Sequence, residues 1–277
     1  MSLTVPAEVL TSVDLPPDVA VEAAGGATGQ LWKVTGPDGQ FALRAGSPGT
    51  ISGHLAAMAA AGRAGLPVPE VIRYATAGPG TATVLLSWLP GMTVFDVVRA
   101  EPARAHRIGV LMGETQRALH EVAAPPELRD ILTAGPTGWL DERTRALPVP
   151  RGSALLHLDF HGLNLLVEGD RISGILDWDN AHAGHPLLDV ARAHTLLTVE
   201  PAFSTLQPGE RAILADLRAG WVEGYGPLAA SIPPVCLAWA GRVMLGDLAR
   251  RYASEPSALD DLRRWTESWE RRSPESH

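Results

Sequence analysis

The chain has 277 residues, of which 45% are hydrophobic and 19% are charged, enough for one large domain or two small ones. Its formal net charge of −8 argues against nucleic acid as a partner, because phosphate binding needs a basic face. No apolar run reaches the ~18–20 residues that span a bilayer, no signal-peptide pattern opens the chain, and the single cysteine, Cys236, excludes an internal disulfide. We therefore expect a cytoplasmic protein without a membrane partner, present as a monomer or weak dimer.

The first 50 residues alternate short apolar segments with turns, which predicts antiparallel strands. A glycine-rich segment at residues 25–30 follows the first of these apolar segments. No helical pattern opens after the glycines, so the segment is neither a dinucleotide-binding fingerprint nor a Walker loop. Its backbone N–H groups can instead lie over a triphosphate, and a plain structural turn is the competing interpretation. The strands are expected at residues 19–21, 31–34 and 41–44.

An alanine-rich segment and two apolar segments complete the N-terminal part. Residues 50–64 are expected to form a helix, because alanine has the highest helix propensity, and Gly65 and Pro67 end it. Two more strands are expected at residues 70–74 and 82–86, with a glycine-proline turn between them. These segments together predict a five-stranded sheet with one helix.

The remainder of the chain, apart from one central polar stretch, is expected to be mainly helical. A strong amphipathic pattern predicts a helix at residues 103–122. Residues 123–150 contain several prolines and show no clear periodicity beyond a short helix near residues 139–146, so we expect a connection over the surface. Further helices, separated by prolines, are expected at residues 190–199, 208–225, 234–254 and 256–271.

The central stretch combines carboxylates, an amide and histidines with flanking apolar segments. Residues 165–167 and 172–176 are apolar and flank a polar turn, which predicts a β-hairpin. A hairpin places the start of its first strand beside the end of its second, so Asn164 and Asp177 are expected to lie close together. Asp159 precedes them in the same loop. Three oxygen-bearing side chains then converge, a ligand set that suits Mg²⁺ when substrate phosphates fill the other positions.

The spacing His157-x-Asp159-x4-Asn164, with Asp177 after one hairpin, resembles the catalytic loop and metal-binding aspartate of the aminoglycoside phosphotransferases, a family of protein-kinase-like enzymes. Leu158 stands where the family often has Gly, and Gly162-Leu163 stand where it often has Pro-Gly. The resemblance covers nearly the whole chain. It implies an α+β, two-lobe, protein-kinase-like fold with a small antiparallel-sheet N-lobe and a larger, mostly helical C-lobe. The two lobes and their linker are expected at residues 1–87, 92–277 and 88–91.

The resemblance also implies roles for individual residues. Asp159 would orient the acceptor hydroxyl and take its proton, and His157 would brace the loop. Asn164 and Asp177 would bind Mg²⁺, and ATP or GTP would donate the phosphate. The residues implied to hold the nucleotide come from the glycine segment, the third strand and the linker, and they are Gly26, Ala27, Thr28, Gly29, Ala42, Arg44, Ser87 and Leu89.

Arg44 stands where the third strand of kinases has Lys. Strand alternation puts Ala42 and Arg44 on one face, where a small residue leaves room for adenine and a cation meets the phosphates. A surface arginine on an edge strand is the competing interpretation, and Lys33 is a second candidate for the cation. Relatives pair this cation with a Glu of the following helix, but that place falls near His54 and the helix has no acid. Either another segment supplies the partner of Arg44, or the phosphates alone hold it.

The resemblance and the acidic balance together indicate a small cationic acceptor, since an acidic cleft attracts amines. The expected acceptor is an antibiotic, an aminoglycoside or a basic cyclic peptide of the viomycin and capreomycin group, so that the enzyme confers resistance. The negative charge equally suits a protein that is merely soluble, and relatives phosphorylate choline, homoserine and other hydroxyl metabolites. The candidate acceptor contacts are His161, Asp179, Glu223 and Asp247.

Two other classes of function stay open on the sequence. The segment His157-x-Asp159-x-His161 can also supply Zn ligands, as in a metal-dependent hydrolase, although this leaves the hairpin and the glycine segment unexplained. The second class is a kinase-like fold that binds a ligand without catalysis. The missing helix acid and the altered catalytic loop are the features that favour it.

Overall fold

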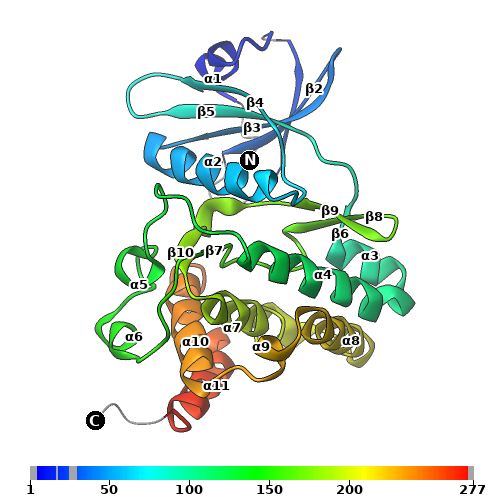
Figure 1. Cartoon of the computed structure of the whole chain (residues 1–277). Helices are drawn as coiled ribbons and strands as arrows, with labels where there is room; N and C mark the ends of the chain where they lie inside the picture. Colours follow the sequence, from blue (N-terminus) through cyan, green and yellow to red (C-terminus); the bar gives the residue numbers. More distant parts are fainter. Residues whose placement is uncertain (1–4, 17, 25–29, 274–277) are drawn as a thin grey trace.

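The computed structural model describes residues 5–16, 18–24 and 30–273, which form two lobes (Figure 1). The N-terminal lobe contains a five-stranded antiparallel sheet with the strand order β1-β2-β3-β5-β4, and the C-terminal lobe is mainly helical. This arrangement agrees with the α+β, two-lobe architecture expected from the sequence. The strands of the N-terminal sheet are β1 (Ala20–Ala23), β2 (Leu31–Gly36), β3 (Gly39–Gly46), β4 (Val71–Thr76) and β5 (Ala82–Ser87).

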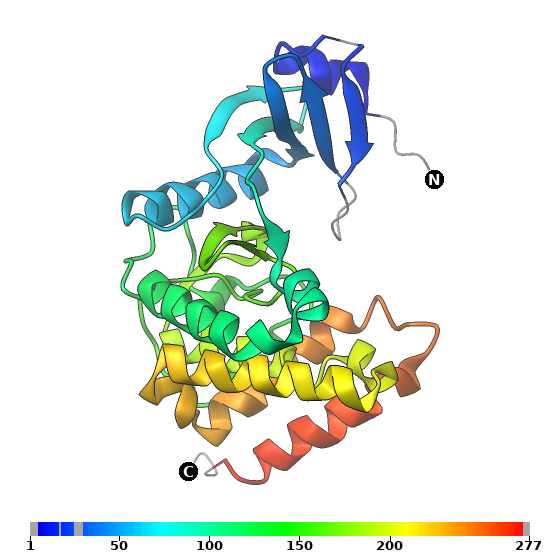
Figure 2. The same cartoon turned by 90° about the vertical axis from the view of Figure 1, so that its right-hand side faces the viewer.

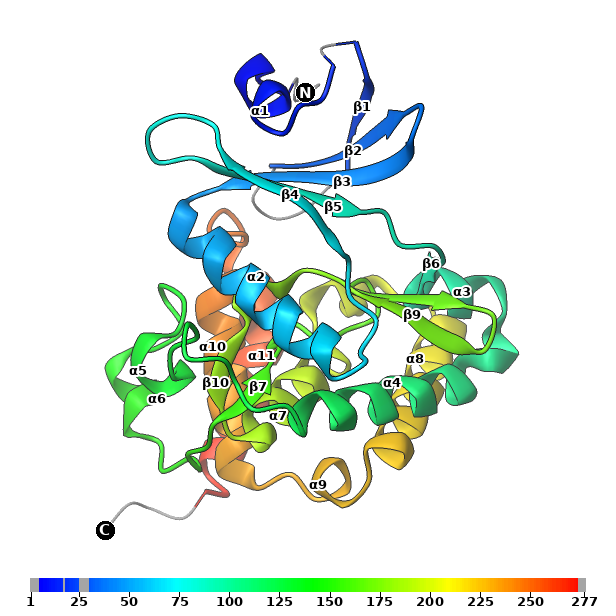
Figure 3. The same cartoon turned by 45° about the horizontal axis from the view of Figure 1, so that its top comes forward.

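The two faces of this sheet bury different partners. Trp32 of β2 lies beside Leu43 of β3, and both side chains are buried against the short helix α1 (Ala7–Ser12), which the sequence did not predict. Ala42 and Arg44 occupy the alternate positions of β3 and therefore lie on the opposite face. Figure 3 shows α1 on one side of the sheet and the longer helix α2, with the C-terminal lobe beyond it, on the other.

Helix α2 (Pro48–Arg63) contacts both lobes. It begins after Ser47, whose Oγ accepts a hydrogen bond from the Thr50 N–H at 3.2 Å. It ends before Gly65, whose φ of 83° lies in the left-handed region that glycine favours at the end of a helix. Its buried face packs on β3 and β5, and it also contacts the 3₁₀ turn η2 (Trp178–Asn180) of the C-terminal lobe.

The C-terminal lobe stacks its helices against short strands that lie near the N-terminal lobe (Figure 2). Strand β6 pairs with β8, β8 with β9, and β7 with β10. These strands are β6 (Met92–Thr93), β7 (Ala154–Leu156), β8 (Leu165–Glu168), β9 (Arg171–Ile175) and β10 (His182–Gly184). The helices are α3 (Val94–Ala100), α4 (Ala105–His120), α5 (Ile131–Ala134), α6 (Glu142–Ala146), α7 (Pro186–Leu196), α8 (Pro208–Tyr225), α9 (Pro227–Ala230), α10 (Pro234–Leu248) and α11 (Asp260–Glu270). A helix with the length and apolar character needed to cross a membrane does not occur among the described residues.

The connection at residues 123–150 differs from its predicted course over the surface. Ile131, Trp139 and Leu140 are buried and share a core cluster with residues of α10. The Trp139 ring also lies 5.1 Å from the guanidinium carbon of Arg192. The expectation was wrong for these positions because isolated apolar residues between prolines produce no periodic pattern, although they still reach the core.

Helices α4 and α8 meet at four glycines, two on each helix. A Cβ atom at any of the four would overlap a backbone carbonyl oxygen of the other helix. Because glycine has no Cβ, the two backbones approach closely along this contact. The glycines are Gly109 and Gly113 of α4 and Gly220 and Gly224 of α8.

Replacing Gly113 with Ala is expected to lower the free energy of unfolding by about 1–3 kcal/mol, because the added methyl group forces the two helices apart. Urea unfolding followed by circular dichroism measures this change. The matched control is Gly209→Ala at the start of α8, where a Cβ meets no atom within 4 Å and alanine only raises helix propensity. An unchanged unfolding midpoint in Gly113→Ala would contradict the close-contact interpretation.

Candidate active site

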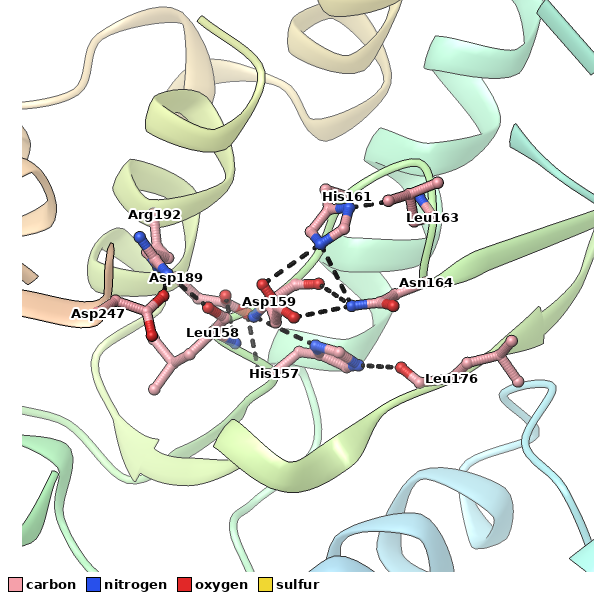
Figure 4. A network of polar contacts seen from close by, with 10 residues as sticks. All are labelled: His157, Leu158, Asp159, His161, Leu163, Asn164, Leu176, Asp189, Arg192 and Asp247. Carbon is pink, nitrogen blue, oxygen red and sulfur yellow. Dashed lines mark hydrogen bonds and ion pairs between the residues drawn. The ribbon is translucent and has the colours of Figure 1, made fainter. Parts of the chain in front are cut away.

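The predicted hairpin of β8 and β9 is present. Figure 4 shows Asn164 before its first strand and Leu176 after its second. Leu165 of β8 pairs with Ile175 of β9. Just beyond this pair, the Leu176 N–H donates a hydrogen bond to the Asn164 carbonyl oxygen at 2.8 Å. The bond brings Asp177, the residue after Leu176, next to Asn164, so the predicted proximity of these two residues is confirmed.

Asp159 is held by two neighbours in the same loop. The Asn164 side-chain amide donates hydrogen bonds to Asp159 Oδ2 and to the Asp159 carbonyl oxygen, both at 2.9 Å, and His161 Nε2 lies 3.4 Å from Oδ1. Burial acts to raise the pKa of Asp159, but the hydrogen bond and charge of His161, with the charge of Arg192, outweigh it and lower the pKa to about 2. The carboxylate is therefore ionised at neutral pH and accepts hydrogen bonds.

His157 connects the catalytic loop to the end of the hairpin. Its Nε2 donates to the Leu176 carbonyl oxygen at 2.9 Å, and its Nδ1 accepts from the Asp159 N–H at 3.3 Å. Burial lowers the pKa of His157, which keeps the ring neutral with one donor and one acceptor nitrogen. Both nitrogens are engaged by backbone groups, so neither is free to bind zinc. This geometry favours the bracing role over the hydrolase interpretation.

A buried carboxylate of α7 ties the loop to the surrounding helices. Asp189 accepts hydrogen bonds from the His157 N–H at 3.0 Å, the Leu158 N–H at 2.8 Å and His120 Nε2 at 2.9 Å. The other ring nitrogen of His120 lies 2.7 Å from the Tyr225 hydroxyl. Burial acts to raise the pKa of Asp189, but the hydrogen bond and charge of His120 lower it. Helices α4, α7 and α8 together position the backbone of the catalytic loop.

Leu158 has a left-handed backbone conformation, with φ of 63°, which strains an L-residue. This conformation explains why the related family often has glycine at this place. The Leu158 side chain is fully buried in a core cluster, so its packing offsets the backbone cost. The departure from the family pattern is therefore accommodated by the core beneath the loop.

Replacing Leu158 with Gly is expected to lower the free energy of unfolding by about 1–3 kcal/mol, since losing a buried leucine costs more than the strain relief of roughly 1–2 kcal/mol returns. The companion variant Leu158→Ala keeps the strained backbone and is expected to be at least as unstable as Leu158→Gly. Denaturant unfolding of both variants measures the difference. If Leu158→Ala is clearly the more stable of the two, backbone strain at this position is negligible.

Arg44 reaches from β3 to the loop that follows the hairpin. Its guanidinium forms an ion pair with Asp179, and Nη1 lies 3.7 Å from Asp177 Oδ1. His54 of α2 lies with Nδ1 3.4 Å from the other oxygen of Asp179. The partner of Arg44 thus comes from the C-terminal lobe, and His54, at the place expected for the helix acid, contacts the same carboxylate.

The two aspartates after the hairpin titrate in opposite directions. Burial, reinforced by the charge of Asp179, raises the pKa of Asp177. Burial also acts to raise the pKa of Asp179, but the hydrogen bond from His54 and the charge of Arg44 lower it. Asp179 is therefore the stabilised anion of the pair, whereas the carboxylate of Asp177 lies 3.7 Å from the guanidinium that Asp179 binds directly.

Asp177 and Asn164 fit a hard divalent cation. Within the described part of the chain, the buried Oδ1 of Asp177 has no hydrogen-bond partner. The amide nitrogen of Asn164 is used by Asp159, which leaves its oxygen for another partner. The described residues contain no cluster of three or more His, Cys, Asp or Glu side chains that could hold a metal unaided. Two oxygen donors match Mg²⁺ if substrate phosphates supply further ligands.

The nucleotide-binding candidates are only partly described. Ala42 and Arg44 share the face of β3 that is directed toward the C-terminal lobe, as strand alternation predicted. On this face the guanidinium of Arg44 contacts the carboxylates of Asp177 and Asp179. The candidates of the glycine segment lie outside the described residues, and they are Gly26, Ala27, Thr28 and Gly29.

The linker candidates lie directly after β5. The Ser87 N–H donates to the Glu70 carbonyl oxygen at 2.9 Å, so this N–H belongs to the sheet. Leu89 is partly buried two residues further on. Between them, Trp88 lies beneath Lys33, with Nζ 4.8 Å from the ring centre. Lys33 pairs with Ala42 across the sheet and therefore lies on the same face as Arg44.

The structure brings three of the four acceptor candidates to the catalytic loop. His161 contacts Asp159, and Asp179 contacts Arg44, as described above. Asp247 of α10 forms an ion pair with Arg192, whose Nε donates to the Leu158 carbonyl oxygen at 3.3 Å (Figure 4).

The fourth acceptor candidate lies elsewhere. Glu223 is an exposed residue of α8, and its Oε2 lies 3.0 Å from His106 Nε2 of α4. This pair sits on the contact between α4 and α8. The structure does not bring Glu223 to the catalytic loop, because helix placement alone does not say which side of α8 faces the loop.

Two residues near the loop were missed from the sequence. Arg192 is buried, and its Nη1 has no hydrogen-bond partner among the described atoms. Burial raises the pKa of Glu200, while the charges of Arg251, Arg192 and His161 act to lower it, so Glu200 lies near the same groups. Arg192 follows Asp189 by three positions and shares its helix face, a spacing that would have identified it.

Comparisons with known proteins give the family and the fold. Residues 19–149 and 127–231 match the model of the phosphotransferase enzyme family, APH. Among solved structures, the chain is similar to a protein of Ralstonia eutropha JMP134 assigned to the aminoglycoside phosphotransferases, with 17% identity, coverage of 97% of this chain and 98% of that one, and a TM-score of 0.66. A search of curated proteins gave no match.

Two further solved structures carry ligand or substrate names. One is a thermostable mutant of the aminoglycoside phosphotransferase APH(4)-Ia in a ternary complex with AMP-PNP and hygromycin B, with 17% identity, coverage of 92% and 94%, and a TM-score of 0.62. The other is the macrolide 2′-phosphotransferase MphH of Brachybacterium faecium, with 17% identity, coverage of 96% of each chain and a TM-score of 0.52. At this identity the likeness establishes the fold.

The two lobes, with a braced loop and hairpin at their junction, have the protein-kinase-like fold of these structures, which confirms the predicted fold class. Because the family model matches well over half of the residues, the chain belongs to the phosphotransferase enzyme family, and the predicted resemblance is confirmed. The protein is therefore an enzyme that transfers phosphate.

Proposed function

We propose that this enzyme transfers the γ-phosphate of ATP or GTP, with Mg²⁺, to a hydroxyl of a small cationic antibiotic and so confers resistance. An aminoglycoside or a basic cyclic peptide is the proposed acceptor. The observation that carries the proposal is the ionised Asp159 beside the Asn164–Asp177 pair, with Arg44 opposite. We also propose that the enzyme acts in the cytoplasm as a monomer or weak dimer, with lobes at residues 1–87 and 92–277 joined at 88–91.

In the proposed reaction, the chain mainly holds and orients the reactants. Asp159 accepts a hydrogen bond from the acceptor hydroxyl and directs its oxygen at the γ-phosphorus. The new O–P bond forms as the bond to the nucleoside diphosphate breaks, and the hydroxyl proton passes to Asp159 and then to solvent. A carboxylate with a pKa of about 2 is a weak base, so it takes this proton late, when the attacking oxygen has lost its electron density to phosphorus.

Arg44, Asn164 and Asp177 would bind the phosphates and their metal ion. The guanidinium can hold two phosphate oxygens at once, which positions the triphosphate relative to Asp159. Asn164 and Asp177 would hold Mg²⁺, which supplies neutralisation of the negative charge on the transferring phosphate when it is bound. His157 and Asp189 keep the backbone of the loop in place for this step.

Two carboxylates beyond the catalytic loop support a cationic acceptor. Asp247 is 36% exposed while it pairs with Arg192, and Glu200 lies near the same arginine. The net charge of −8 adds a long-range attraction for polyamines. The names of the similar structures support an antibiotic as well, because two of them are an aminoglycoside phosphotransferase bound with hygromycin B and a macrolide phosphotransferase.

A substrate panel tests this function. The protein is incubated with ATP or GTP and with aminoglycosides, viomycin, capreomycin, macrolides, choline or homoserine, and the diphosphate product and the mass of the acceptor are followed. We expect a basic antibiotic to gain one phosphate, and the Asp159→Asn variant to lose this activity. Phosphorylation of choline or homoserine alone would overturn the resistance proposal and leave a metabolite kinase. Stoichiometric, tightly bound zinc without phosphate transfer would instead support a hydrolase.

A further inference from the structure

We infer that Asp179 is a positioning residue for the nucleotide-binding arginine, and that it performs from the C-terminal lobe the role that a helix acid performs in other kinase-like enzymes. His54 supports it from α2. The inference rests on the proposed function, because it requires Arg44 to meet the phosphates. It also replaces the sequence-based expectation that Asp179 contacts the acceptor.

Both oxygens of the Asp179 carboxylate are already used by the N-terminal lobe. Oδ2 pairs with Arg44 of β3, and Oδ1 lies 3.4 Å from His54 Nδ1 of α2. Arg44 is 8% exposed and His54 is 4% exposed, so both groups meet the carboxylate away from bulk water. An acceptor amine would have to displace one of these buried partners. The contacts therefore suit an internal counter-charge better than a substrate contact.

A buried guanidinium needs such a counter-charge, because a buried charge without a partner is costly. Helix α2 carries no Asp or Glu anywhere between Pro48 and Arg63. The other nearby acid, Asp177, has its Oδ1 3.7 Å from Arg44 Nη1, which is beyond direct hydrogen-bond distance. Asp179 is therefore the direct anionic partner of Arg44 among the described residues.

The ion pair with Asp179 also keeps Arg44 away from Asp177, the proposed metal ligand. The guanidinium pairs with Asp179 while its Nη1 lies 3.7 Å from Asp177 Oδ1, so we expect it to turn to Asp177 when Asp179 is replaced. An arginine paired with Asp177 would compete with a divalent cation for the same oxygen. By holding the guanidinium at a distance, Asp179 leaves Asp177 available and leaves Arg44 directed to the phosphates.

The ion pair between Arg44 and Asp179 connects the two lobes. Arg44 and His54 belong to the N-terminal lobe, whereas Asp179 belongs to the turn η2, which packs against α2. The orientation of Arg44 therefore depends on how the lobes sit together. A change at Asp179 is expected to affect nucleotide binding although the residue follows the catalytic hairpin.

The first test is Asp179→Asn, with ADP and AMP-PNP binding measured by isothermal titration calorimetry in the presence of Mg²⁺. We expect the Kd for both nucleotides to rise by about 10- to 100-fold, the range of a lost charge-assisted hydrogen bond. Asp170→Asn is the matched control, since it removes one negative charge at a side chain that is 82% exposed. Its Kd is expected to stay within about twofold of the wild type. Thermal unfolding of each variant shows whether the fold is retained.

The second test places an acidic residue on helix α2 in place of Asp179. Asp179→Ala alone is expected to weaken ADP binding, and His54→Glu added to it is expected to recover at least about tenfold of the loss, since the His54 side chain contacts the same carboxylate that Arg44 contacts. In a double-mutant cycle, Arg44→Ala and Asp179→Ala are expected to be strongly non-additive in ADP affinity. A purely structural role for Asp179 would produce neither the recovery nor the coupling.

The outcomes separate this inference from the function on which it rests. If Asp179→Asn binds ADP as the wild type does and only weakens binding of the best acceptor of the panel, the inference is overturned and Asp179 is an acceptor contact. If ADP affinity falls but Arg44→Ala and Asp179→Ala prove additive, Asp179 does not act through Arg44. If the wild-type protein binds no nucleotide, the proposed function itself fails.

Discussion

Asp159→Asn is expected to lower kcat by about 100- to 10,000-fold while the KM for nucleotide changes little, because an amide cannot take the proton of the acceptor hydroxyl. The neighbours of Asp159 make the variant informative. His161 and Asn164 both direct donor groups at its carboxylate, and these contacts keep the carboxylate ionised. Steady-state kinetics with the best acceptor of the substrate panel measures the loss.

The control for Asp159→Asn is its stability and nucleotide affinity. An asparagine of the same shape still accepts one hydrogen bond, so the loop is expected to keep its conformation. The affinity of the protein for ADP is expected to stay unchanged. The ionised carboxylate has a folded-state pKa below the ordinary value, so it stabilises the protein above pH ~4 and this contribution disappears in the variant. Wild-type activity in Asp159→Asn would show that a different group serves the acceptor, or that phosphate transfer needs none.

Asp177→Asn is expected to lower kcat by at least about 100-fold, since one ligand of the proposed Mg²⁺ becomes neutral. The unfolding temperature is expected to stay unchanged or to rise. Burial and Asp179 raise the pKa of Asp177, so keeping its carboxylate ionised costs folding free energy at neutral pH, and asparagine removes that cost. Asparagine also tolerates the left-handed backbone at this position, where φ is 56°.

The measurement for Asp177→Asn is a Mg²⁺ titration of activity beside differential scanning calorimetry. A variant with lower activity, a higher Mg²⁺ requirement and an undiminished unfolding temperature supports the metal-ligand assignment. The exposed control Asp170→Asn is expected to match the wild type in both measurements. If Asp177→Asn unfolds at a much lower temperature, its effect on activity says nothing about metal, and the residue is structural.

The local part of the site was predictable from the sequence. A hairpin of fixed register brings Asn164 next to Asp177 whatever the rest of the chain does, because both residues flank the same pair of strands. Alternation along β3 places Ala42 and Arg44 on one face for the same reason. These predictions depend only on periodicity and on turn geometry, which the sequence carries within about 20 residues.

The contacts between distant segments were not predictable in this way. Arg44 and Asp179 are 135 positions apart, and their pairing depends on how the two lobes pack. The partner of Arg44 was therefore left open, and Asp179 was expected on the acceptor side. The burial of Trp139 was missed because a single apolar residue among prolines carries no pattern. Glu223 was expected at the acceptor site only because it lies on a predicted helix. The glycine contact of α4 with α8 decides which face of α8 turns inward.

Lys33 provides a single side-chain site for covalent labelling. It is the only lysine in the sequence, and it lies over Trp88 on the same face as Ala42 and Arg44. An amine-directed reagent therefore has one side-chain target in the whole protein, beside the proposed nucleotide site. Covalent labelling at Lys33, and its slowing by ADP, reports occupancy of that site by mass spectrometry without an acceptor. The same position accepts a fluorophore whose signal Trp88 can quench, which turns nucleotide binding into an optical measurement.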